Sequence, residues 1–495
     1  MRPPAALLCL TPAPRAAPIS MLFPSFGAKP AKLIPQLADT APSWEHLRAH
    51  AFSTPTGTRM ASEVEERATG AGSTHTDAKL RLFGRPESDV RVVLYRDTAA
   101  WCPYCQKVWL QLELKQIPFR VEKINMRSYG DKPTWFLQKV RGGLLPAIEL
   151  DGNFITESLT IMQILDREFP DGPPMIPPPG TEERERATTL LQLERELFSW
   201  CTLTFQPGKG MFDGHEKQFL SCLKRVDVEL GATKAIRENG DYNNLEKWLQ
   251  AFEELPEYIA TKSDYYTHVM DIPPQYGPGY SVKEAADFEA KIGGKGDSWR
   301  LPLSLSEQTL EPLAPLQDVG DEAARHEAAF KLVSNNVAVT RFAARGAGEE
   351  GEPRFQAPLA DPYAKPNEAM VPAVDTCLRH VATSLLDGVE QVATLTLSQR
   401  GVTCNLATVA SPAATADCAA ATAEEAKELI RCLCYLRDRV GCPRDMGQVS
   451  PRTASYLVIA GYCPYCLIRC VHETRQAAAM HFRAHLNWMI DVLSA

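Results

Sequence analysis

The chain has 495 residues, a net charge of −8 and 44% apolar residues. This length is long for one domain and predicts two or three. The acidic balance argues against nucleic-acid binding, and no uninterrupted apolar run is long enough to cross a bilayer. The 14 cysteines are spread too widely for a small disulfide-stapled secreted domain, so the two CxxC pairs among them point to redox or metal chemistry.

The N-terminal 62 residues are rich in Ala, Pro, Ser and Thr. Their charged residues are the bases Arg2, Arg15, Lys29, Lys32, Arg48 and Arg59 and the acids Asp39 and Glu45. A basic, hydroxylated, acid-poor leader is typical of an organelle transit peptide, for the chloroplast or the mitochondrion. A disordered tail without a targeting role is the alternative. We therefore assign residues 1–76 to a transit peptide or disordered leader.

Strand and helix signals alternate over the next part of the chain. The pattern predicts strands at residues 92–95, 119–124, 147–150 and 153–155, and helices at residues 106–115, 132–140 and 157–169. Asp151-Gly152 between the last two strands is a hairpin signal. The order βαβαββα predicts a thioredoxin-like α/β domain with a mixed sheet over residues 77–175.

A proline-rich linker at residues 171–180 separates this domain from helical sequence. Helices predicted at residues 182–202, 216–230 and 245–252 make residues 181–300 an all-α domain. Further helices, at residues 322–345, 370–386, 421–439 and 476–493, make residues 320–495 a mostly helical extension. Within it, segments 392–421 and 447–475 show no useful period, and translated intron sequence or a gene-model error is one explanation for them.

The tetrapeptide Cys102-Pro103-Tyr104-Cys105 lies where a predicted strand hands over to a helix. A helix N-terminus carries partial positive charge and free N–H groups, which stabilise a thiolate. Pro103 suits the first helical turn. The position predicts Cys102 as the solvent-side nucleophile, with Cys105 one turn deeper as the thiol that resolves a mixed disulfide. Two buried structural cysteines are the alternative.

Four motifs follow one another in this region: residues 101–105, 131–137, 143–146 and Glu157-Ser158. Together they resemble the N-terminal domain of cysteine-type glutathione transferases, Omega-like in pattern, and CPYC is also the glutaredoxin tetrapeptide. Arg-Ala-His-Leu-Asn-Trp at residues 483–488 looks like the Iota class of photosynthetic organisms. The resemblance implies a thioredoxin-like domain followed by the all-α C-terminal domain of a glutathione transferase.

The resemblance also implies glutathione as the cofactor. The backbone of Leu145, beside a cis Pro146, would pair with the cysteinyl amide, and Lys132 with the glycyl carboxylate. Glu157 and Ser158, at a helix N-terminus, suit the γ-glutamyl end. The implied glutathione-binding residues are Tyr104, Lys132, Leu145, Pro146, Glu157 and Ser158. Plainer explanations are a solvated surface lysine at position 132 and helix capping by Thr156 or Ser158.

Two further sets of residues are candidates for binding. By resemblance, Trp200 and Phe205 face the acceptor-substrate pocket, although such an aromatic pair is also typical of a helical core. A second CPYC occupies residues 463–466, but the 29 residues after it cannot complete a second thioredoxin-like domain. Its neighbourhood offers a candidate zinc or iron–sulfur ligand set, Cys463, Cys466, Cys470 and His472.

The expected activity is that of a glutathione-dependent thiol transferase or oxidoreductase, which removes glutathione from mixed disulfides or reduces a small oxidant of the dehydroascorbate type through Cys102. Expected partners are glutathione, glutathionylated thiols or a small oxidised substrate, and a second copy of the chain as a homodimer. A redox-gated ligand carrier without catalytic activity, and an iron–sulfur scaffold held by glutathione and Cys102, are the alternatives.

Overall fold

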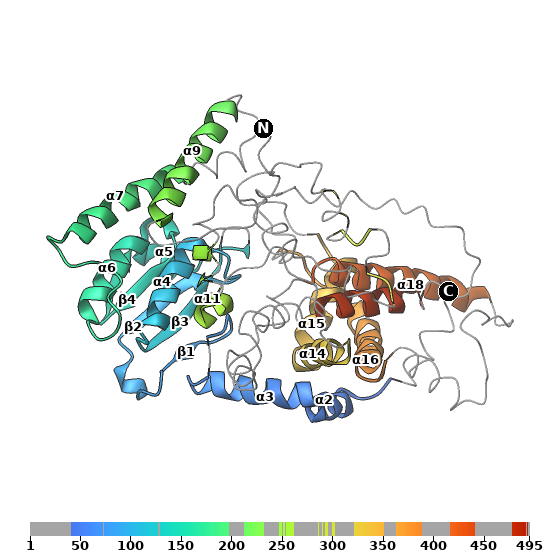
Figure 1. Cartoon of the computed structure of the whole chain (residues 1–495). Coiled ribbons are helices and arrows are strands. Elements are labelled where there is room, and N and C mark those ends of the chain that lie inside the picture. Colours follow the sequence, from blue (N-terminus) through green and yellow to red (C-terminus); the bar gives the residue numbers. More distant parts are fainter. Residues whose placement is uncertain are drawn as a thin grey trace.

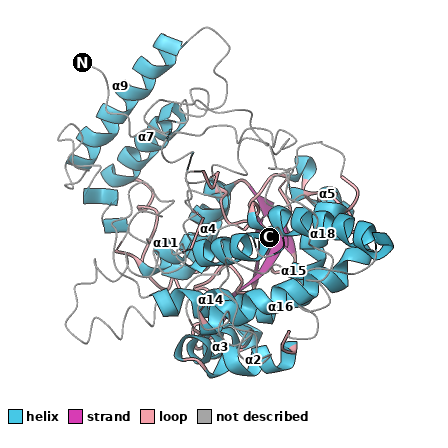
Figure 2. Ribbon diagram, turned by 90° about the vertical axis from the view of Figure 1, so that its right-hand side faces the viewer, coloured by secondary structure: helices cyan, strands magenta, loops and turns pink. Residues whose placement is uncertain are grey.

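The computed structural model describes residues 41–197 apart from 73, 127 and 128, residues 212–231, short stretches between 247 and 301, and residues 321–350, 363–388, 416–440 and 478–493 apart from 492. The described strands form one small sheet among many helices (Figure 2). Trp200, Phe205 and the second CPYC with its neighbouring ligand candidates lie outside the described residues.

The α/β part follows the predicted order. Its elements are β2 (Val92–Asp97), α4 (Pro103–Leu114), β3 (Phe119–Ile124), α5 (Thr134–Lys139), β4 (Ala147–Leu150), β5 (Asn153–Thr156) and α6 (Ser158–Glu168). The sequence analysis missed β1 (Leu80–Arg81), which pairs antiparallel with β3 and is too short to show a period. The sheet order is β1-β3-β2-β4-β5, in which β2 and β3 are parallel and the other pairs antiparallel. This is the predicted thioredoxin-like arrangement.

Helices cover both faces of this sheet, as the period of β2 requires. Because successive side chains of a strand point to opposite faces, Val92 and Leu94 join one core with α4 and α6. Tyr95 lies in a second core with Phe136 of α5. The chain thus builds three layers, and both cores hold β2 in the middle of the domain.

The predicted all-α region is helical where it is described. Helices α7 (Glu182–Leu197) and α9 (Phe212–Gly231) pack against each other, and α11 (Pro256–Thr261) packs against α4. Figure 1 shows α7 and α9 side by side, beyond the sheet. Among the described residues, no helix has both the length and the apolar content that a bilayer crossing requires.

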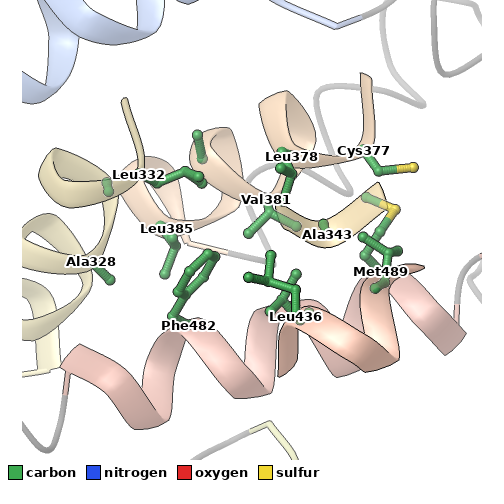
Figure 3. Packing of buried hydrophobic residues seen from close by; sticks show 14 of the residues in the cluster. Ala328, Leu332, Ala343, Cys377, Leu378, Val381, Leu385, Leu436, Phe482 and Met489 are labelled. Atoms are coloured by element: carbon green, nitrogen blue, oxygen red, sulfur yellow. The ribbon is translucent and has the colours of Figure 1, made fainter. Parts of the chain in front are cut away.

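The extension forms its own helical core. Its elements are α14 (Asp321–Ser334), α15 (Asn336–Ala343), η7 (Ala344–Ala347), η8 (Glu368–Met370), α16 (Val371–Asp387), α18 (Ala416–Arg437) and a helix over residues 478–491. Buried aliphatic side chains from these helices interdigitate around Val381, Leu385 and Phe482 (Figure 3). The helix predicted at 322–345 is broken, because Asn335 has non-helical backbone angles (φ −126°, ψ 18°). Residues 416–421, predicted to lack a period, begin α18.

The prediction of a disordered leader over residues 1–76 is wrong for its second half. Helices α2 (Trp44–Ser53) and α3 (Pro55–Ala68) occupy it, and Leu47 and Ala51 are buried in the core of the extension. Trp44 Nε1 donates to Asp375 Oδ1 of α16 at 2.6 Å. Helix α3 contacts both β1 and α14, so these N-terminal helices run beneath the two parts of the molecule (Figure 1). The composition of this segment suggested a leader. It could not show that a few apolar residues of α2 are buried against helices far away in the sequence.

Two buried histidines of the 478–491 helix, His481 and His485, lie beside the exposed Asp321 at the start of α14. His481 Nε2 lies 2.8 Å from Asp321 Oδ1, and His485 Nδ1 lies 2.7 Å from the carbonyl oxygen of His481. The pair with His481 holds the pKa of the Asp321 carboxyl below its usual range. Burial, reinforced by the nearby Arg325, lowers the pKa of His485 to about 3. His485 therefore stays neutral in the folded protein.

This burial predicts a loss of stability in mild acid. An unfolded histidine titrates near pH 6.5, so between pH 6.5 and 3 the unfolded chain binds one proton more than the folded chain. The free energy of unfolding should fall by about 2 kcal/mol between pH 7 and pH 5. Urea unfolding of the wild-type chain and of a His485→Gln variant measures it. Asp321 does not contribute in this window, because its stabilisation is lost only below the ordinary range of a carboxyl.

The measured quantity is the change in the free energy of unfolding with pH, rather than its value at one pH. The slope should be smaller in His485→Gln and unchanged in the control His46→Gln, which alters an exposed histidine of α2. Equal slopes in the wild type and in His485→Gln would contradict the assignment.

Candidate functional site

The strand register brings the four sequence motifs to one end of the sheet. Tyr95 of β2 pairs with Ala147 of β4, and Ala147 pairs with Thr156 of β5. The end of β2 therefore lies beside the start of β4 and the end of β5. The CPYC turn follows β2, the Leu145-Pro146 turn precedes β4, and Glu157-Ser158 follows β5. The parallel strand β3 ends there too, so the loop that carries Lys132 starts from the same edge.

Cys102 is the N-cap residue of α4. Its backbone is extended (φ −70°, ψ 114°), and Pro103 is the first residue of the helix. The Cys102 carbonyl accepts the first helical hydrogen bond, from Gln106 N at 3.0 Å. Because the helix begins directly after the sulfur-bearing residue, the positive end of the helix dipole lies at the thiol. The helix starts three residues earlier than predicted, which places all of Pro103, Tyr104 and Cys105 in its first turn.

The two cysteines differ in depth less than predicted. The exposed fraction is 6% for Cys102 and 1% for Cys105. Cys102 is thus the outer cysteine, as expected, but it is buried rather than open to solvent. Burial raises the pKa of the Cys105 thiol well above its ordinary value, and the neighbouring Cys102 and Asp97 raise it further. Cys105 therefore remains a thiol under conditions in which an ordinary cysteine begins to ionise.

Asp97, the last residue of β2, organises the turn before the cysteines. Its Oδ2 accepts hydrogen bonds from the backbone N–H groups of Trp101, at 2.8 Å, and Cys102, at 3.4 Å. The side chain of Trp101 is anchored in turn by a bond from its Nε1 to Tyr129 OH at 3.0 Å. Sequence reasoning missed Asp97. The available signal was an acid at the end of a buried strand, a short turn before Cys102.

Two cations balance the negative groups of the site. Burial lowers the pKa of Lys132. The electrostatic attraction of its ammonium group to Cys105, Cys102 and Asp97 acts in the opposite direction and raises this pKa. Arg96 is fully buried, donates to the carbonyls of Asp97 (2.8 Å) and Thr76 (2.5 Å), and feels the same potentials of Asp97 and Cys105. Lys132 thus lies near the groups of the cysteine turn, and its pairing with a glycyl carboxylate, which the resemblance implied, stays a prediction.

The segment before β4 has the special geometry that the sequence suggested. The Leu145–Pro146 peptide bond is cis, and Gly142 and Gly143 both have positive φ, 79° and 62°. A Cβ on Gly143 would lie 2.8 Å from Leu137 Cδ2 and 3.1 Å from Lys132 Cδ. The positive φ favours glycine at position 143, and a larger residue would also require the side chains of Leu137 and Lys132 to move.

Glu157 and Ser158 also occupy a special backbone position. Glu157 is the N-cap of α6 and has φ 67° and ψ 105°, an uncommon conformation for a residue with a side chain. Such outliers persist where the surrounding structure imposes them and cluster at functional sites. Ser158 is the first helical residue, so its N–H belongs to the unpaired donors of a helix start. The Glu157 side chain is exposed and available to a ligand.

Tyr104 and one residue of the extension lie at the border of the site. Tyr104 is half-buried, and Lys107 Nζ lies 5.0 Å from the centre of its ring. From the extension, Tyr363 OH donates to Asp131 Oδ1 at 3.3 Å, next to Lys132. The sequence offered no signal for this contact, which links the third region to the loop that carries Lys132.

Comparison with known proteins places the same segment in one family of domains. Residues 101–168 match the family model described as "Glutathione S-transferase, N-terminal domain". The segment is therefore similar to that domain family, and its sheet order is thioredoxin-like. The match covers a small share of the chain and does not extend to the helical regions.

Several curated proteins are similar to this part of the chain. Glutathione S-transferase DHAR2 of Arabidopsis thaliana is 30% identical over 134 residues, 27% of this chain and 56% of that protein. The probable cytosolic glutathione S-transferase DHAR1 of Oryza sativa subsp. japonica is 33% identical, over 28% of this chain and 58% of that protein. Glutathione S-transferase omega-1 of Rattus norvegicus is 34% identical, over 17% of this chain and 33% of that protein. The chain thus spans about half the length of the first curated relatives it matches.

Solved structures align with a similar share of the chain. Glutathione transferase Omega 3C from Trametes versicolor is 23% identical, with a TM-score of 0.26, over 39% of this chain and 75% of that one. A glutathione transferase family member from Pseudomonas fluorescens, with bound glutathione, is 18% identical, with a TM-score of 0.28. The alignment covers 35% of this chain and 99% of that one. Scores this low add nothing to the assignment of the α/β domain.

The depth of Cys105 predicts its chemical inertness. In a Cys102→Ser variant, iodoacetamide at pH 8 should leave Cys105 unmodified while the protein is folded, because little of this thiol is ionised or reachable. Peptide mass spectrometry measures the modification at position 105. The same variant in urea serves as the control and should be modified fully. Equal rates in the folded and unfolded chains would contradict the burial.

Proposed function

We propose that this chain is a glutathione-dependent thiol transferase and reductase that uses Cys102 as its nucleophile. The observation that supports the proposal most directly is the convergence, at one end of the sheet, of Cys102 at a helix start, the cis Leu145–Pro146 turn, and the Ser158 helix start. Relatives whose names include DHAR and omega-1, both glutathione S-transferases, favour the same activity.

Glutathione would lie along this edge of the sheet. The Ser158 N–H and the exposed Glu157 carboxylate suit the charged γ-glutamyl end. The Leu145 backbone would pair with the peptide of the cysteinyl residue, beside Cys102. Lys132 would face the glycyl carboxylate, and Tyr104 would line the same side of the thiol. These five positions are the cradle that the proposal assigns to glutathione.

The reaction would proceed by thiol–disulfide exchange. The Cys102 thiolate attacks the glutathionyl sulfur of a mixed disulfide, the substrate sulfur leaves as a thiolate and takes up a proton, and Cys102 carries the glutathionyl group. The thiolate of a second glutathione then attacks that group, which forms oxidised glutathione and restores the Cys102 thiolate. Resolution by Cys105 is disfavoured, because burial raises the pKa of that thiol. With a small two-electron oxidant of the dehydroascorbate type, Cys102 and one glutathione would supply the two electrons and form the same mixed disulfide, which a second glutathione then releases as oxidised glutathione.

Other parts of the proposal come from the sequence. The acid-poor N-terminus favours import into the chloroplast, and one relative is named as a chloroplastic DHAR3 of Arabidopsis thaliana, whereas the rice DHAR1 is named cytosolic. A mitochondrial or cytoplasmic location is the alternative. Homodimer formation, the Iota-like class, and an acceptor pocket at Trp200 and Phe205 remain predictions. The ligand-carrier and iron–sulfur alternatives also stay predictions.

The division of roles between the two cysteines is directly testable. Cys102→Ser should lower the rate of deglutathionylation by about 10³-fold or more, because it removes the nucleophile. Cys105→Ser should keep most of the activity, since a second glutathione resolves the intermediate. A coupled assay with a glutathionylated peptide measures both rates. A Cys102→Ser chain with full activity would rule the mechanism out. A folded but inactive Cys105→Ser chain would mean that Cys105, rather than a second glutathione, resolves the disulfide on Cys102.

Lys132 should act on glutathione binding rather than on chemistry. A charge-assisted hydrogen bond is worth about 1.5–3 kcal/mol, and partial solvation reduces it here, so Lys132→Met should raise KM for glutathione about tenfold with little change in kcat. Lys139→Met is the matched control, an exposed lysine of α5, and should leave KM unchanged. Equal KM values for Lys132→Met and the wild type would remove Lys132 from the cradle.

A further inference from the structure

Three ligand atoms lie together at the start of α4. One carboxylate oxygen of Asp97 and the sulfurs of Cys102 and Cys105 all lie within 4.8 Å of one another, and all three residues are buried. Asp97 is 1% exposed. Within the described part of the chain, its Oδ1 has no hydrogen-bond partner, although Oδ2 is used by the backbone of the turn. A buried carboxylate oxygen without a partner costs about 1–3 kcal/mol, so a further group that binds it is stabilising.

We propose that Asp97, Cys102 and Cys105 form a binding site for a thiophilic divalent cation of the zinc class. Two thiolates separated by two residues at a helix start are a common zinc-binding arrangement, and a carboxylate is a regular third ligand. Sulfur ligands select zinc or cadmium over magnesium and calcium. Three protein ligands leave the fourth coordination position to an external group, on the side of Cys102, the less buried of the two cysteines.

The distances require only a small contraction. Ligand atoms around a tetrahedral zinc ion are roughly 3.5 Å apart, so atoms within 4.8 Å need to approach by about 1 Å. Side-chain rotation of the two cysteines can supply this movement. The backbone bonds from Trp101 and Cys102 hold the Asp97 carboxylate in place as the fixed member of the set.

The charged groups around the site determine which ligands can bind there. The two thiolates and the carboxylate carry three negative charges, against the positive charges of Arg96 and Lys132. A divalent cation brings the sum to +1, and a fourth ligand that is itself an anionic thiolate brings it to zero. Binding releases the two thiol protons, which are replaced by bonds from sulfur to the metal. The site thus favours a cation together with an external thiol.

The occupied site would mask the nucleophile. Cys102 cannot attack a disulfide while its thiolate is bound to a metal ion, so zinc would inhibit the thiol chemistry reversibly. This consequence alone rests on the proposed function. The binding site itself does not, because its ligands come from the chain and its occupancy is measured without glutathione.

Cadmium titration of the reduced full-length chain tests the site. The number of bound ions and the ultraviolet thiolate-to-cadmium absorbance are measured for the wild type, Cys102→Ser, Cys105→Ser and Asp97→Asn. Both serine variants should bind one ion fewer than the wild type. Asp97→Asn keeps an oxygen for the Trp101 N–H but lacks the anion, so it should bind this ion roughly tenfold more weakly or worse.

The control uses the other CPYC of the chain. A Cys463→Ser/Cys466→Ser double variant should retain the ion that depends on Asp97, whereas a Cys102→Ser/Cys105→Ser double variant with the same number of cysteines should lose it. Equal binding by the wild type and Cys102→Ser would overturn the site. Unchanged affinity in a folded Asp97→Asn chain would overturn the carboxylate ligand. Deglutathionylation assayed with a chelator present tests the proposed function separately.

Discussion

The antiparallel pairing of β2 with β4 brings the cysteine turn and the Leu145-Pro146 turn to one end of the sheet, on which the candidate site depends. Its register sets the end of β2 beside the turn before β4, and the pairing of β4 with β5 adds the start of α6. A shift by one residue would also turn Leu94 away from the core that it shares with α4 and α6. The burial of β2 on both faces therefore secures the geometry on which any chemistry at Cys102 depends.

Electrostatics at this edge follow from the same burial. The dipole of α4, Lys132 and the buried Arg96 favour negative charge near the sulfurs, whereas Asp97 and the low polarity of the interior oppose it. At the deeper Cys105 the effects that oppose negative charge are the stronger, so its pKa rises. The start of α4 thus carries a deep thiol with a raised pKa, Cys105, one turn from the outer Cys102.

The sequence predicted the α/β domain well and the rest unevenly. Strands and helices around CPYC were predicted because their periods and their Gly and Pro punctuation are local signals, and the cis Leu145–Pro146 bond came by resemblance. Asp97 was missed because its role depends on two backbone N–H groups that only the folded turn brings to it. Helices α2 and α3 were missed because they are stabilised by burial against α14 and α16, far away in sequence.

The account requires the buried Cys102 to be reachable by glutathione in the native protein. Incubation of the folded chain with oxidised glutathione at neutral pH, followed by peptide mass spectrometry, measures this most directly. The account predicts one glutathionyl group on Cys102 and none on Cys105. A native chain in which Cys102 stays unmodified, although the urea-unfolded chain is modified there, would contradict it.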